Sequence, residues 1–271
     1  MPELPEVEVI RRELKPQLIG EIFDSVNVFW AKSYENRAQG TIPGKTIIDF
    51  DRRGKYLIVV LDKGYLVVHL RMTGQLMIVT ALPDNGRHLQ VVFRMRSGKY
   101  LVYFDARKFG RLIHCDELDG VLKNTGLDAL AQEFSASVFR RMLRSRSRMI
   151  KSFLMDQKQI AGLGNIYVDE SLFRAGIHPR TLTSEIPAAK ARLLFEAIKD
   201  ILNRSIGSMG TTISDYKTVG GGFGAYQNAL QVYGRAGELC PVCGGKIAKI
   251  RINNRGTHFC ARCQKPRRKH R

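Results

Sequence analysis

The start of this chain has the residue types of a nucleophile. The sequence begins Met1-Pro2-Glu3, so removal of the methionine leaves the secondary amine of Pro2 beside a carboxylate. An α-amino group titrates near pH 8, roughly two units below a lysine, and an appreciable fraction is therefore unprotonated at neutral pH. Because the proline amine is secondary and conformationally fixed, its condensation with a carbon electrophile gives a charged iminium ion without further loss of a proton. The alternative is that Pro2 only directs removal of the methionine.

An amphipathic helix is predicted to hold this amine in place. Apolar residues recur three or four positions apart, as one face of a helix requires, at Val7, Ile10, Leu14 and Leu18. Glu3, Glu6 and Glu8 lie at the start of this run, where acidic side chains interact favourably with the helix dipole. The dipole accounts for their charge, but it does not account for an N-terminus held against a folded core.

Four of the five cysteines form a pattern typical of a metal site. Cys240 and Cys243 make one Cys-x-x-Cys pair, Cys260 and Cys263 make another, and 16 residues separate the two pairs. The two-residue spacing lets both thiolates of a pair reach one tetrahedral zinc ion. A complete set of four thiolates leaves no position for water, so the pattern predicts one structural Zn²⁺ per chain rather than a catalytic one. His258 is a competing ligand candidate.

The segment between the cysteine pairs is predicted to be a hairpin that contacts phosphate. Apolar residues alternate with polar ones, the period of a half-buried strand, at Ala248, Ile250 and Ile252. The next four residues, Asn253-Asn254-Arg255-Gly256, are typical of a hairpin turn with Arg255 at its tip. The last 33 residues contain ten Lys or Arg and no Asp or Glu, so we expect the hairpin to face a phosphate backbone. A solubilising basic tail is the alternative for residues 267–271.

The composition favours a partner that carries many negative charges. The chain has 271 residues, of which 44% are hydrophobic and 25% charged, as is ordinary for a globular protein with room for two domains. Its 44 Lys and Arg against 25 Asp and Glu give a net charge of +19, which favours nucleic acid before membrane. No apolar run approaches the roughly 18 residues of a membrane span, and the acidic start is unlike a signal peptide. We therefore expect a cytoplasmic protein, and we take it to be a monomer.

The first half of the chain is predicted to be rich in strands and the second half in helices. Short β-rich runs, separated by Gly, Asp and Asn, occupy residues 45–50, 56–61, 65–70, 89–96, 100–104 and 110–113. They predict a sandwich or barrel-like β domain. Helical runs follow at residues 137–143, 149–156, 165–175 and 188–206, with Gly176 and Gly207 placed as C-caps. Residues 211–225 lack periodicity and contain too much glycine for a packed element, so we expect a mobile loop there.

A glycine-bearing turn joins two of the predicted helices. It reads Ala161-Gly162-Leu163-Gly164-Asn165, and exposed N–H groups at the start of the second helix could bind a phosphate. A single Gly-x-Gly is unspecific by itself. The alternative role of Asn165 is to cap the helix.

Five stretches of the chain are more specific, namely Pro2-Glu3-Leu4-Pro5-Glu6-Val7-Glu8, Arg52-Arg53-Gly54-Lys55-Tyr56-Leu57, His69-Leu70-Arg71-Met72-Thr73-Gly74, Asp105-Ala106-Arg107-Lys108-Phe109-Gly110 and the run from Asp156 to Pro179. They resemble motifs of the Fpg/Nei superfamily of DNA-repair enzymes, and within it the bacterial formamidopyrimidine-DNA glycosylases. The last run is similar to the helix-two-turn-helix signature of the superfamily. Leu4 favours the formamidopyrimidine-DNA glycosylases, because the related endonuclease VIII typically has glycine at this position.

The resemblance implies an α+β fold in three parts. We expect an N-terminal helix plus a catalytic β-sandwich domain at residues 1–115, followed by a linker at 116–135. A helical helix-two-turn-helix DNA-binding domain would occupy residues 136–225, with 211–225 as its lesion-recognition loop. A C-terminal β-hairpin zinc finger would occupy residues 236–271.

The resemblance also implies a bifunctional DNA glycosylase and AP lyase that acts on double-stranded DNA in base-excision repair. Its substrates would be oxidised purines, namely 8-oxoguanine and formamidopyrimidines. Pro2 would be the nucleophile, and Glu3 would protonate the sugar ring oxygen. Lys55 and Arg255 would assist β- and δ-elimination, with Glu6 in a supporting role. Without the resemblance, Lys55 would be an exposed lysine at a strand end.

A second set of residues is implied to hold the DNA. Met72 would fill the gap left by the extruded nucleotide, Arg107 would face the orphaned base, and Phe109 would wedge beside it. The family's contact with the DNA backbone beside the lesion falls on Asn165. Two further DNA-contact positions of the family fall near His88 and Arg146. Judged by residue type alone, Met72 and Phe109 would be core residues.

Two other functions are open at this point. One is an endonuclease VIII-like glycosylase for oxidised pyrimidines, which shares the motifs. The other is a non-catalytic zinc-ribbon DNA-binding protein, for which the net charge of +19 and the four cysteines would suffice.

Overall fold

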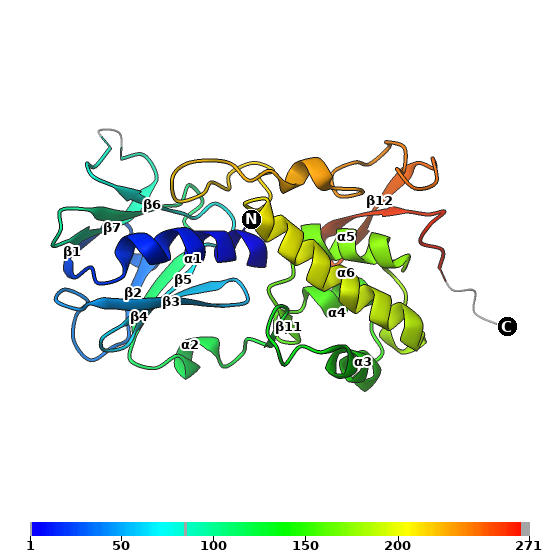
Figure 1. Cartoon of the computed structure of the whole chain (residues 1–271), viewed down its shortest axis with the longest axis horizontal. Helices are drawn as coiled ribbons and strands as arrows, with labels where there is room; N and C mark the ends of the chain where they lie inside the picture. The colour runs from blue at the N-terminus through cyan, green and yellow to red at the C-terminus, as the bar shows by residue number, and fades with distance from the viewer. Residues whose placement is uncertain (1, 84–85, 267–271) are drawn as a thin grey trace. The chain divides into compact units, whose positions relative to one another are not determined.

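The computed structural model describes residues 2–83 and 86–266 and divides into two compact units (Figure 1). The first unit contains the chain up to Asn124 together with Ser205–Gln227, and the second contains Thr125–Arg204 together with the chain from Asn228 onward. The basic tail that we predict at 267–271 lies outside the described residues. Among the residues that are described, no helix is both long enough and apolar enough to cross a membrane.

Helix α1 (Leu4–Leu18) opens the first unit, and a reciprocal cap fixes its start. Glu3 is the N-cap residue: its side chain accepts a hydrogen bond from the backbone N–H of Glu6, and the Glu6 side chain accepts one from the N–H of Glu3. This capping box satisfies two of the N–H groups that the start of a helix leaves without partners. The predicted apolar face is confirmed, because each of its members is at most 1% exposed: Val7, Ile10, Leu14 and Leu18.

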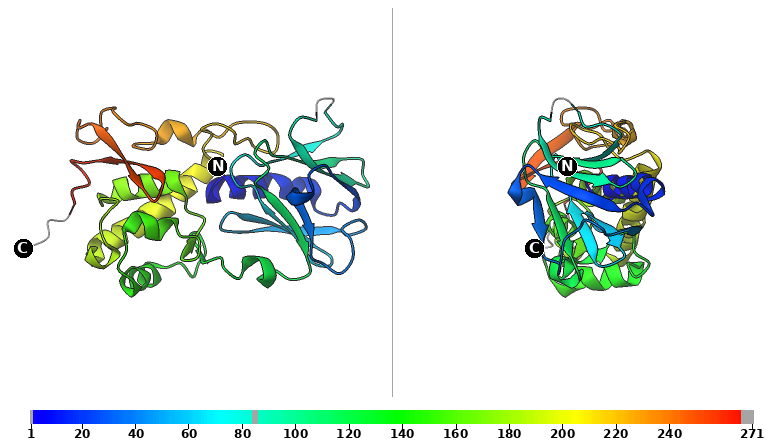
Figure 2. Two further views of the ribbon diagram at one scale, coloured as in Figure 1. Left: turned by 180° about the vertical axis from the view of Figure 1, so that it is seen from behind. Right: turned by 90° about the vertical axis from the view of Figure 1, so that its left-hand side faces the viewer.

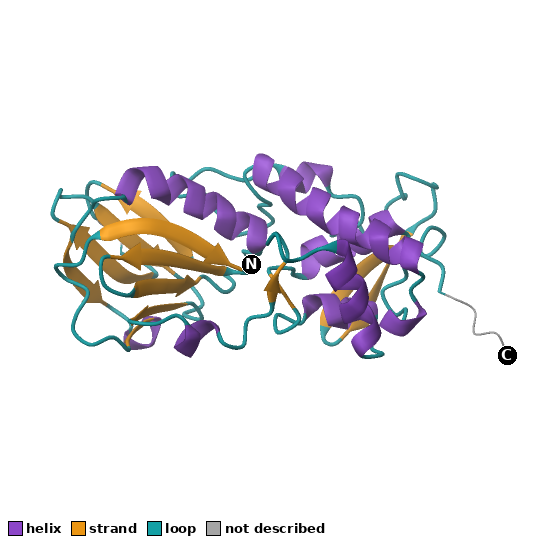
Figure 3. Ribbon diagram, turned by 60° about the horizontal axis from the view of Figure 1, so that its bottom comes forward, coloured by secondary structure: helices purple, strands orange, loops and turns teal. Residues whose placement is uncertain are grey.

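Two sheets and α1 enclose the core of the first unit (Figure 3). The four-stranded sheet has the order β1 (Phe23–Val28), β7 (Leu89–Met95), β8 (Tyr100–Phe104) and β6 (Gln75–Val79). The five-stranded sheet has the order β2 (Tyr34–Asn36), β9 (Arg111–Cys115), β5 (Tyr65–His69), β4 (Tyr56–Leu61) and β3 (Ile47–Arg53). Only the β2–β9 pair within it is parallel. The predicted β-sandwich with an N-terminal helix is confirmed, and with it the α+β class. The short elements η1 (Ala31–Ser33) and α2 (Asp119–Leu122) lie in its connections.

The sequence does not predict three strands of this unit, β1, β2 and β6. Each lies at an edge of its sheet, where one side of the strand has no neighbour. In β1 the one buried residue is Phe23, and β2 has none. These two strands therefore show few apolar side chains, and β6, although largely apolar, lacks the alternation that identifies a half-buried strand in a sequence.

Helices form most of the second unit up to residue 204. They are α3 (Ala136–Ser145), α4 (Ile150–Met155), α5 (Asn165–Ala175) and α6 (Ala188–Gly207), whose last residues belong to the first unit. A parallel pair of short strands, β10 (Leu127–Asp128) and β11 (Ile160–Ala161), and the 3-10 turn η2 (Thr183–Glu185) accompany them. Gly176 ends α5 in the left-handed conformation, with φ at 62°, as predicted. Gly207 is instead the last residue of α6, and the left-handed residues beyond it are Met209 and Gly210.

A two-stranded hairpin follows near the end of the described chain, coloured orange to red in Figure 2. Its strands β12 (Ile247–Ile252) and β13 (Arg255–Cys260) are antiparallel, and both residues of its turn, Asn253 and Asn254, have positive φ. Positive φ at both central residues is typical of the type I′ turn, which fits the twist of a hairpin. Arg255 pairs with Ile252 at the start of β13, so our placement of Arg255 at the tip of the turn is wrong by one position.

The segment 205–227 belongs to the first unit. We expect residues 211–225 to be too rich in glycine to pack, and this part of the expectation is wrong. Tyr216 and Val219 are 4% and 2% exposed and join the core beneath α1. The Val219 N–H also donates to the carboxylate of Glu13 in α1, at 2.7 Å. As expected, residues 211–225 contain no helix or strand, and the 3-10 turn η3 (Tyr226–Ala229) follows them.

Candidate active site and nucleic-acid interface

Pro2 and Glu3 lie buried at the start of α1. Glu3 is 2% exposed, and its N–H donates to Glu6 Oε2 at 2.8 Å. Pro2 is buried as well, although it belongs to no helix or strand. The capping box therefore holds Glu3 in one position next to Pro2, the predicted nucleophile. A disordered chain start would not hold these two residues in place.

Glu6 links this helix start to the segment 205–227. Its Oε2 accepts the Glu3 N–H, and its Oε1 accepts the Thr211 N–H at 2.8 Å. Glu6 is 1% exposed, so both bonds form away from water, where hydrogen bonds are stronger. The supporting role expected for Glu6 corresponds in the structure to a bridge between two backbone segments.

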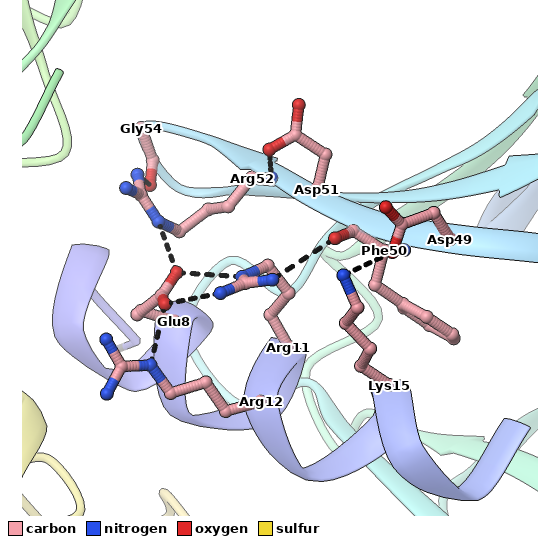
Figure 4. Close-up of polar contacts among 9 residues, drawn as sticks. All are labelled: Glu8, Arg11, Arg12, Lys15, Asp49, Phe50, Asp51, Arg52 and Gly54. Carbon is pink, nitrogen blue, oxygen red and sulfur yellow. Dashed lines mark hydrogen bonds and ion pairs between the residues drawn. The ribbon is translucent and has the colours of Figure 1, made fainter. Parts of the chain in front are cut away.

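Glu8 is the centre of an arginine cluster that ties α1 to β3 (Figure 4). Its carboxylate accepts hydrogen bonds from Arg11 at 2.8 and 3.0 Å, from Arg12 at 2.8 Å and from Arg52 at 3.1 Å. Arg52 also donates to the carbonyl of Gly54 at 3.2 Å. Burial alone would raise the pKa of Glu8, but the hydrogen bonds from Arg11 and Arg12, with the charges of Arg11 and Arg52, outweigh it and lower the pKa to about 2. From the sequence we expect Glu8 only to interact with the helix dipole, although an acid three and four residues before arginines favours such pairs.

Lys55 lies in the turn between β3 and β4, directly after the carbonyl that Arg52 holds. It is 6% exposed, so the alternative of an exposed lysine at a strand end is wrong. Burial, followed by the charges of Arg71 and Lys55, lowers the pKa of His69 in β5 to about 3. At neutral pH an uncharged imidazole therefore lies within the electrostatic reach of Lys55. His69 was not among the predicted site residues, and its sequence signal is its place at the head of the motif that contains Met72.

Met72, Arg107 and Phe109 form one cluster. Arg107 Nη1 lies 3.4 Å from Met72 Sδ, and the guanidinium carbon of Arg107 lies 4.8 Å from the centre of the Phe109 ring. Phe109 is 49% exposed and Met72 is half-buried, so neither is the core residue that its type alone suggests. The three side chains expected to enter the gap in DNA are thus already in contact, although they come from two loops.

His88 lies on the same unit and has a backbone φ of 67°. It lines a hollow of about 260 Å³ together with Thr73, Gln75 and Asp215. The Gln75 amide donates to the Asp215 carbonyl at 2.6 Å. The hollow is therefore lined both by His88, an expected DNA contact, and by Asp215 of the segment 205–227.

In the second unit, Asn165 and Arg255 are brought together through Gly256. Asn165 is the first residue of α5, and its Nδ2 donates to the Gly256 carbonyl at 2.9 Å. Its Oδ1 is buried and has no hydrogen-bond partner within the described residues. The N-cap of α5 is Gly164, so helix capping is not the role of Asn165. Arg255 is exposed and lines a pocket of about 260 Å³ with further basic side chains.

A buried ion pair anchors the hairpin to two helices. Lys151 Nζ of α4 and Asp169 Oδ1 of α5 are 2.6 Å apart, and both side chains are fully buried. Asp169 Oδ2 accepts the His258 N–H at 2.8 Å, and Lys151 donates to the Gly256 carbonyl at 3.3 Å. The backbone of β13 beside Arg255 is thus tied to α4 and α5. Loss of one partner of a buried ion pair is strongly destabilising, so we regard Lys151 and Asp169, neither of which was predicted, as anchors of this surface.

Arg146 lies in the second unit. It is the exposed residue that ends α3, and its carbonyl accepts a hydrogen bond from the Thr183 hydroxyl at 2.5 Å. The structure fixes its backbone and leaves its side chain at the surface.

The four cysteines form a site that fits one zinc ion. All four Sγ atoms lie within 4.8 Å of one another, with 3.8 Å between Cys240 and Cys263 and 3.4 Å between Cys243 and Cys260. Four thiolates about 2.3 Å from one zinc ion in a tetrahedron are about 3.8 Å apart, so the observed spacing fits. His258 is no ligand, because its ring nitrogen faces Asp169 at 3.4 Å and the cluster among the described residues consists of cysteines alone.

Comparison with known proteins gives the family. The formamidopyrimidine-DNA glycosylase N-terminal domain matches residues 1–112, the formamidopyrimidine-DNA glycosylase H2TH domain matches 125–217, and the zinc finger found in FPG and IleRS matches 237–266. The chain is 42% identical to the formamidopyrimidine-DNA glycosylase of Pelotomaculum thermopropionicum, over 98% of this chain and 99% of that one. The chain belongs to the formamidopyrimidine-DNA glycosylase family.

Solved structures of this family share the fold. A structure of MutM with DNA containing carbocyclic 8-oxo-G matches with a TM-score of 0.88 and 37% identity, over 97% of this chain and 100% of that one. The wild-type Lactococcus lactis FPG in complex with DNA containing an oxidised pyrimidine also has a TM-score of 0.88, with 36% identity over 97% of this chain and 100% of that one. The zinc-finger match and the four clustered cysteines together identify one structural zinc site.

Proposed function

We propose that this chain is a bifunctional DNA glycosylase and AP lyase that excises oxidised purines, namely 8-oxoguanine and formamidopyrimidines, from double-stranded DNA in base-excision repair. The observation that carries the proposal is the start of α1, where Pro2 is buried next to Glu3 and the Glu3–Glu6 capping box fixes the backbone. A secondary amine held beside a carboxylic acid suits covalent catalysis at a sugar carbon. A zinc-ribbon protein that only binds DNA has no need of this arrangement.

The reaction begins when the Pro2 amine, uncovered by removal of Met1, attacks C1′ of the damaged nucleotide. The bond from nitrogen to C1′ forms as the bond to the base breaks, and the base leaves with the proton that the Pro2 nitrogen gives up. Glu3 gives a proton to the ring oxygen, the C1′–O4′ bond opens, and a cationic iminium remains. This cation acidifies C2′, so loss of a C2′ proton expels the 3′ phosphate, and a second elimination expels the 5′ phosphate. The strand is then cut on both sides of the lost nucleoside.

Lys55, Arg255 and Glu6 assist these steps. Lys55 is buried in the turn between β3 and β4, where its charge acts on the departing phosphates with little screening by water. Arg255 is exposed at the start of β13, where it can pair with a phosphate oxygen. Glu6 keeps Glu3 in position through the Glu3 N–H.

The damaged nucleotide has to leave the stack before Pro2 can reach its sugar. Met72, Arg107 and Phe109 fill the gap it leaves, and their mutual contacts support this role. Residues 211–225 read the extruded base. The DNA backbone is held by Asn165, His88 and Arg146, and the zinc ion keeps the hairpin that carries Arg255 folded. The protein works as a monomer in the bacterial cytoplasm, at the nucleoid.

A preference for oxidised pyrimidines is the second candidate. It is favoured by the Lactococcus lactis FPG structure, which holds DNA with an oxidised pyrimidine. Single-turnover excision from two duplexes of the same sequence, one with 8-oxoguanine and one with thymine glycol, separates the candidates. We expect 8-oxoguanine to be removed at least about tenfold faster. Equal rates, or faster removal of thymine glycol, would overturn the assignment to oxidised purines.

A further inference from the structure

Met72, Arg107 and Phe109 together are called the gap-filling cluster below. Asp105 is a buried carboxylate that joins the two loops from which these side chains come. It is 0% exposed and accepts four hydrogen bonds. Thr73 Oγ1 donates to it at 2.5 Å and the Gly110 N–H at 2.7 Å, while the Arg107 N–H and the Tyr103 hydroxyl each donate at 3.1 Å. Thr73 directly follows Met72 in the chain. The donors Arg107 and Gly110 lie in the loop that also carries Phe109.

The Thr73 hydroxyl is the direct link between these loops. It donates to Asp105 Oδ1 and also accepts the backbone N–H of Arg107 at 3.2 Å. One hydroxyl therefore contacts both the carboxylate that organises the Arg107 loop and the backbone of Arg107 itself. No side chain of the gap-filling cluster, Met72, Arg107 or Phe109, takes part in this support, so all three remain available to a ligand.

The surroundings of Asp105 leave little room for movement. Gln90, which is 2% exposed, donates to the carbonyls of His88 and Asp105 at 3.0 and 3.2 Å. The Asp105 N–H donates to the His88 carbonyl at 2.9 Å. Gly110 passes so close to Tyr103 that an added Cβ would lie 1.6 Å from the Tyr103 hydroxyl. The loop that carries Arg107 and Phe109 is thus held by the His88 backbone and packed against the buried side chains of Gln90 and Tyr103.

Asp105 remains ionised at neutral pH. Burial raises its pKa, but the hydrogen bonds from Thr73, Gly110, Arg107 and Tyr103 together outweigh burial and leave the pKa below its ordinary value. A charged acceptor makes stronger hydrogen bonds than a neutral one.

We propose that Asp105 and Thr73 are positioning residues that hold Met72, Arg107 and Phe109 as one pre-formed group before DNA is bound. The inference rests on the proposed function, in which these three side chains enter the gap. Side chains already ordered in the free protein lose less conformational entropy on binding. The support therefore favours extrusion of the damaged nucleotide, although neither Asp105 nor Thr73 touches the reacting atoms.

The test compares Thr73→Val with Thr73→Ser. Valine has the shape of threonine without the hydroxyl, whereas serine keeps the hydroxyl, and Thr46→Val is the matched control at a position away from the loops. We expect Thr73→Val to slow single-turnover excision from an 8-oxoguanine duplex about tenfold, while Thr73→Ser and Thr46→Val stay within twofold of the wild type. Unchanged melting temperatures would show that the variants remain folded.

A second readout needs no DNA. Trp30 is the single tryptophan of the chain, and Lys108 Nζ of the Arg107 loop lies 4.3 Å from the centre of its ring. A loosened loop should therefore expose Trp30, and we expect acrylamide to quench its fluorescence more strongly in Thr73→Val than in Thr73→Ser. The proposal is overturned if Thr73→Val shows wild-type quenching or wild-type excision.

A double-mutant cycle separates this inference from the proposed function. If Thr73 acts through Arg107, Thr73→Val should add little to the defect of Arg107→Ala. Full additivity would overturn the positioning role. A wild-type rate for Arg107→Ala itself would contradict the gap-filling function, while the quenching measurement would still decide whether Thr73 holds the loop.

Discussion

Glu6 shows how much one carboxylate can organise at the start of this chain. Its two oxygens accept N–H groups from two backbone segments, Glu3 before the helix and Thr211 beyond α6. A carboxylate can serve both donors because each of its oxygens is an acceptor, whereas an amide has one acceptor oxygen and one donor nitrogen.

Glu6→Gln should therefore place an NH₂ group against one of these backbone N–H groups. We expect a loss of about 1–3 kcal/mol in the free energy of unfolding, together with slower base excision because the backbone of Glu3 is less firmly held. Glu13→Gln is the matched control: Glu13 also connects α1 to the segment 205–227, but one of its oxygens accepts the Val219 N–H, and glutamine keeps one such oxygen. Urea denaturation of the two variants checks the prediction, and equal losses would contradict it.

At the scale of elements, the Glu8 cluster joins α1 to the strand that leads to Lys55 (Figure 4). The pKa of Glu8 is lowered from 4.5 to about 2, so the folded state favours the ionised form. The resulting stability is fully present above about pH 4.5 and is lost as the pH falls towards 2. From the size of this shift, its contribution at neutral pH is up to about 3 kcal/mol.

Glu8→Gln should lower the free energy of unfolding at pH 7 by up to this amount, and its difference from the wild type should shrink as the pH falls from about 4.5 to 2. Asp49→Asn is the control, because the Lys15–Asp49 ion pair also connects α1 to β3, at 2.7 Å, but has exposed side chains. Exposed pairs contribute little to stability, so this variant should change stability much less. Denaturation curves between about pH 2 and 7 give the free energy of unfolding of both variants. Equal losses in Glu8→Gln and Asp49→Asn at every pH would contradict this interpretation.

The elements differ in how far the sequence predicts them. The apolar face of α1, the central strands of both sheets and the four cysteines follow from local spacing, so they could be predicted. The edge strands β1 and β2 could not, because they bury too little to show a pattern, and the edge strand β6 is a short apolar run without alternation. Tyr216 and Val219 were missed for a different reason, since isolated apolar residues in a glycine-rich segment show no period.

The candidate site divides in the same way. Residues within a recognisable motif, such as Pro2, Lys55 and Arg107, could be identified as candidates. The side chains that support them were missed because their partners are distant in the sequence: Thr73 lies 32 residues from Asp105, and Lys151 lies 18 from Asp169. Such pairs become visible when the fold brings their elements together.

The zinc-bound hairpin is an element whose fold depends on metal. Its small cluster of buried residues consists of Cys240 and Cys260 with Phe173, Val232 and Ile247, and the other two zinc cysteines, Cys243 and Cys263, pack against it. Cys243→Ala should therefore reduce zinc content below one ion per chain and weaken DNA binding by disordering the hairpin that carries Arg255. Elemental analysis and a binding titration check this result. Active protein without zinc, or unchanged affinity in a zinc-free variant, would contradict it.

At the scale of the whole molecule, the net charge of +19 should make DNA binding strongly dependent on salt. Each phosphate that the protein neutralises adds roughly 0.9 to the slope of log affinity against log salt concentration. Arg255→Ala should reduce this slope by about one unit and weaken binding to lesion DNA more than to undamaged DNA. Arg251→Ala removes the same charge from the neighbouring strand and serves as the control. A wild-type slope and wild-type lesion affinity in Arg255→Ala would show that Arg255 is no phosphate ligand.

The central claim is that the Pro2 amine is the nucleophile, and borohydride trapping on an 8-oxoguanine duplex tests it most directly. Processed protein should form a covalent adduct whose DNA-bearing peptide, mapped by mass spectrometry, begins at Pro2. Protein verified to retain Met1 should still bind the duplex but form no adduct and release no base, because its Pro2 nitrogen is a tertiary amide. Full base excision by the Met1-retaining protein, or an adduct mapped to Lys55, would contradict the account.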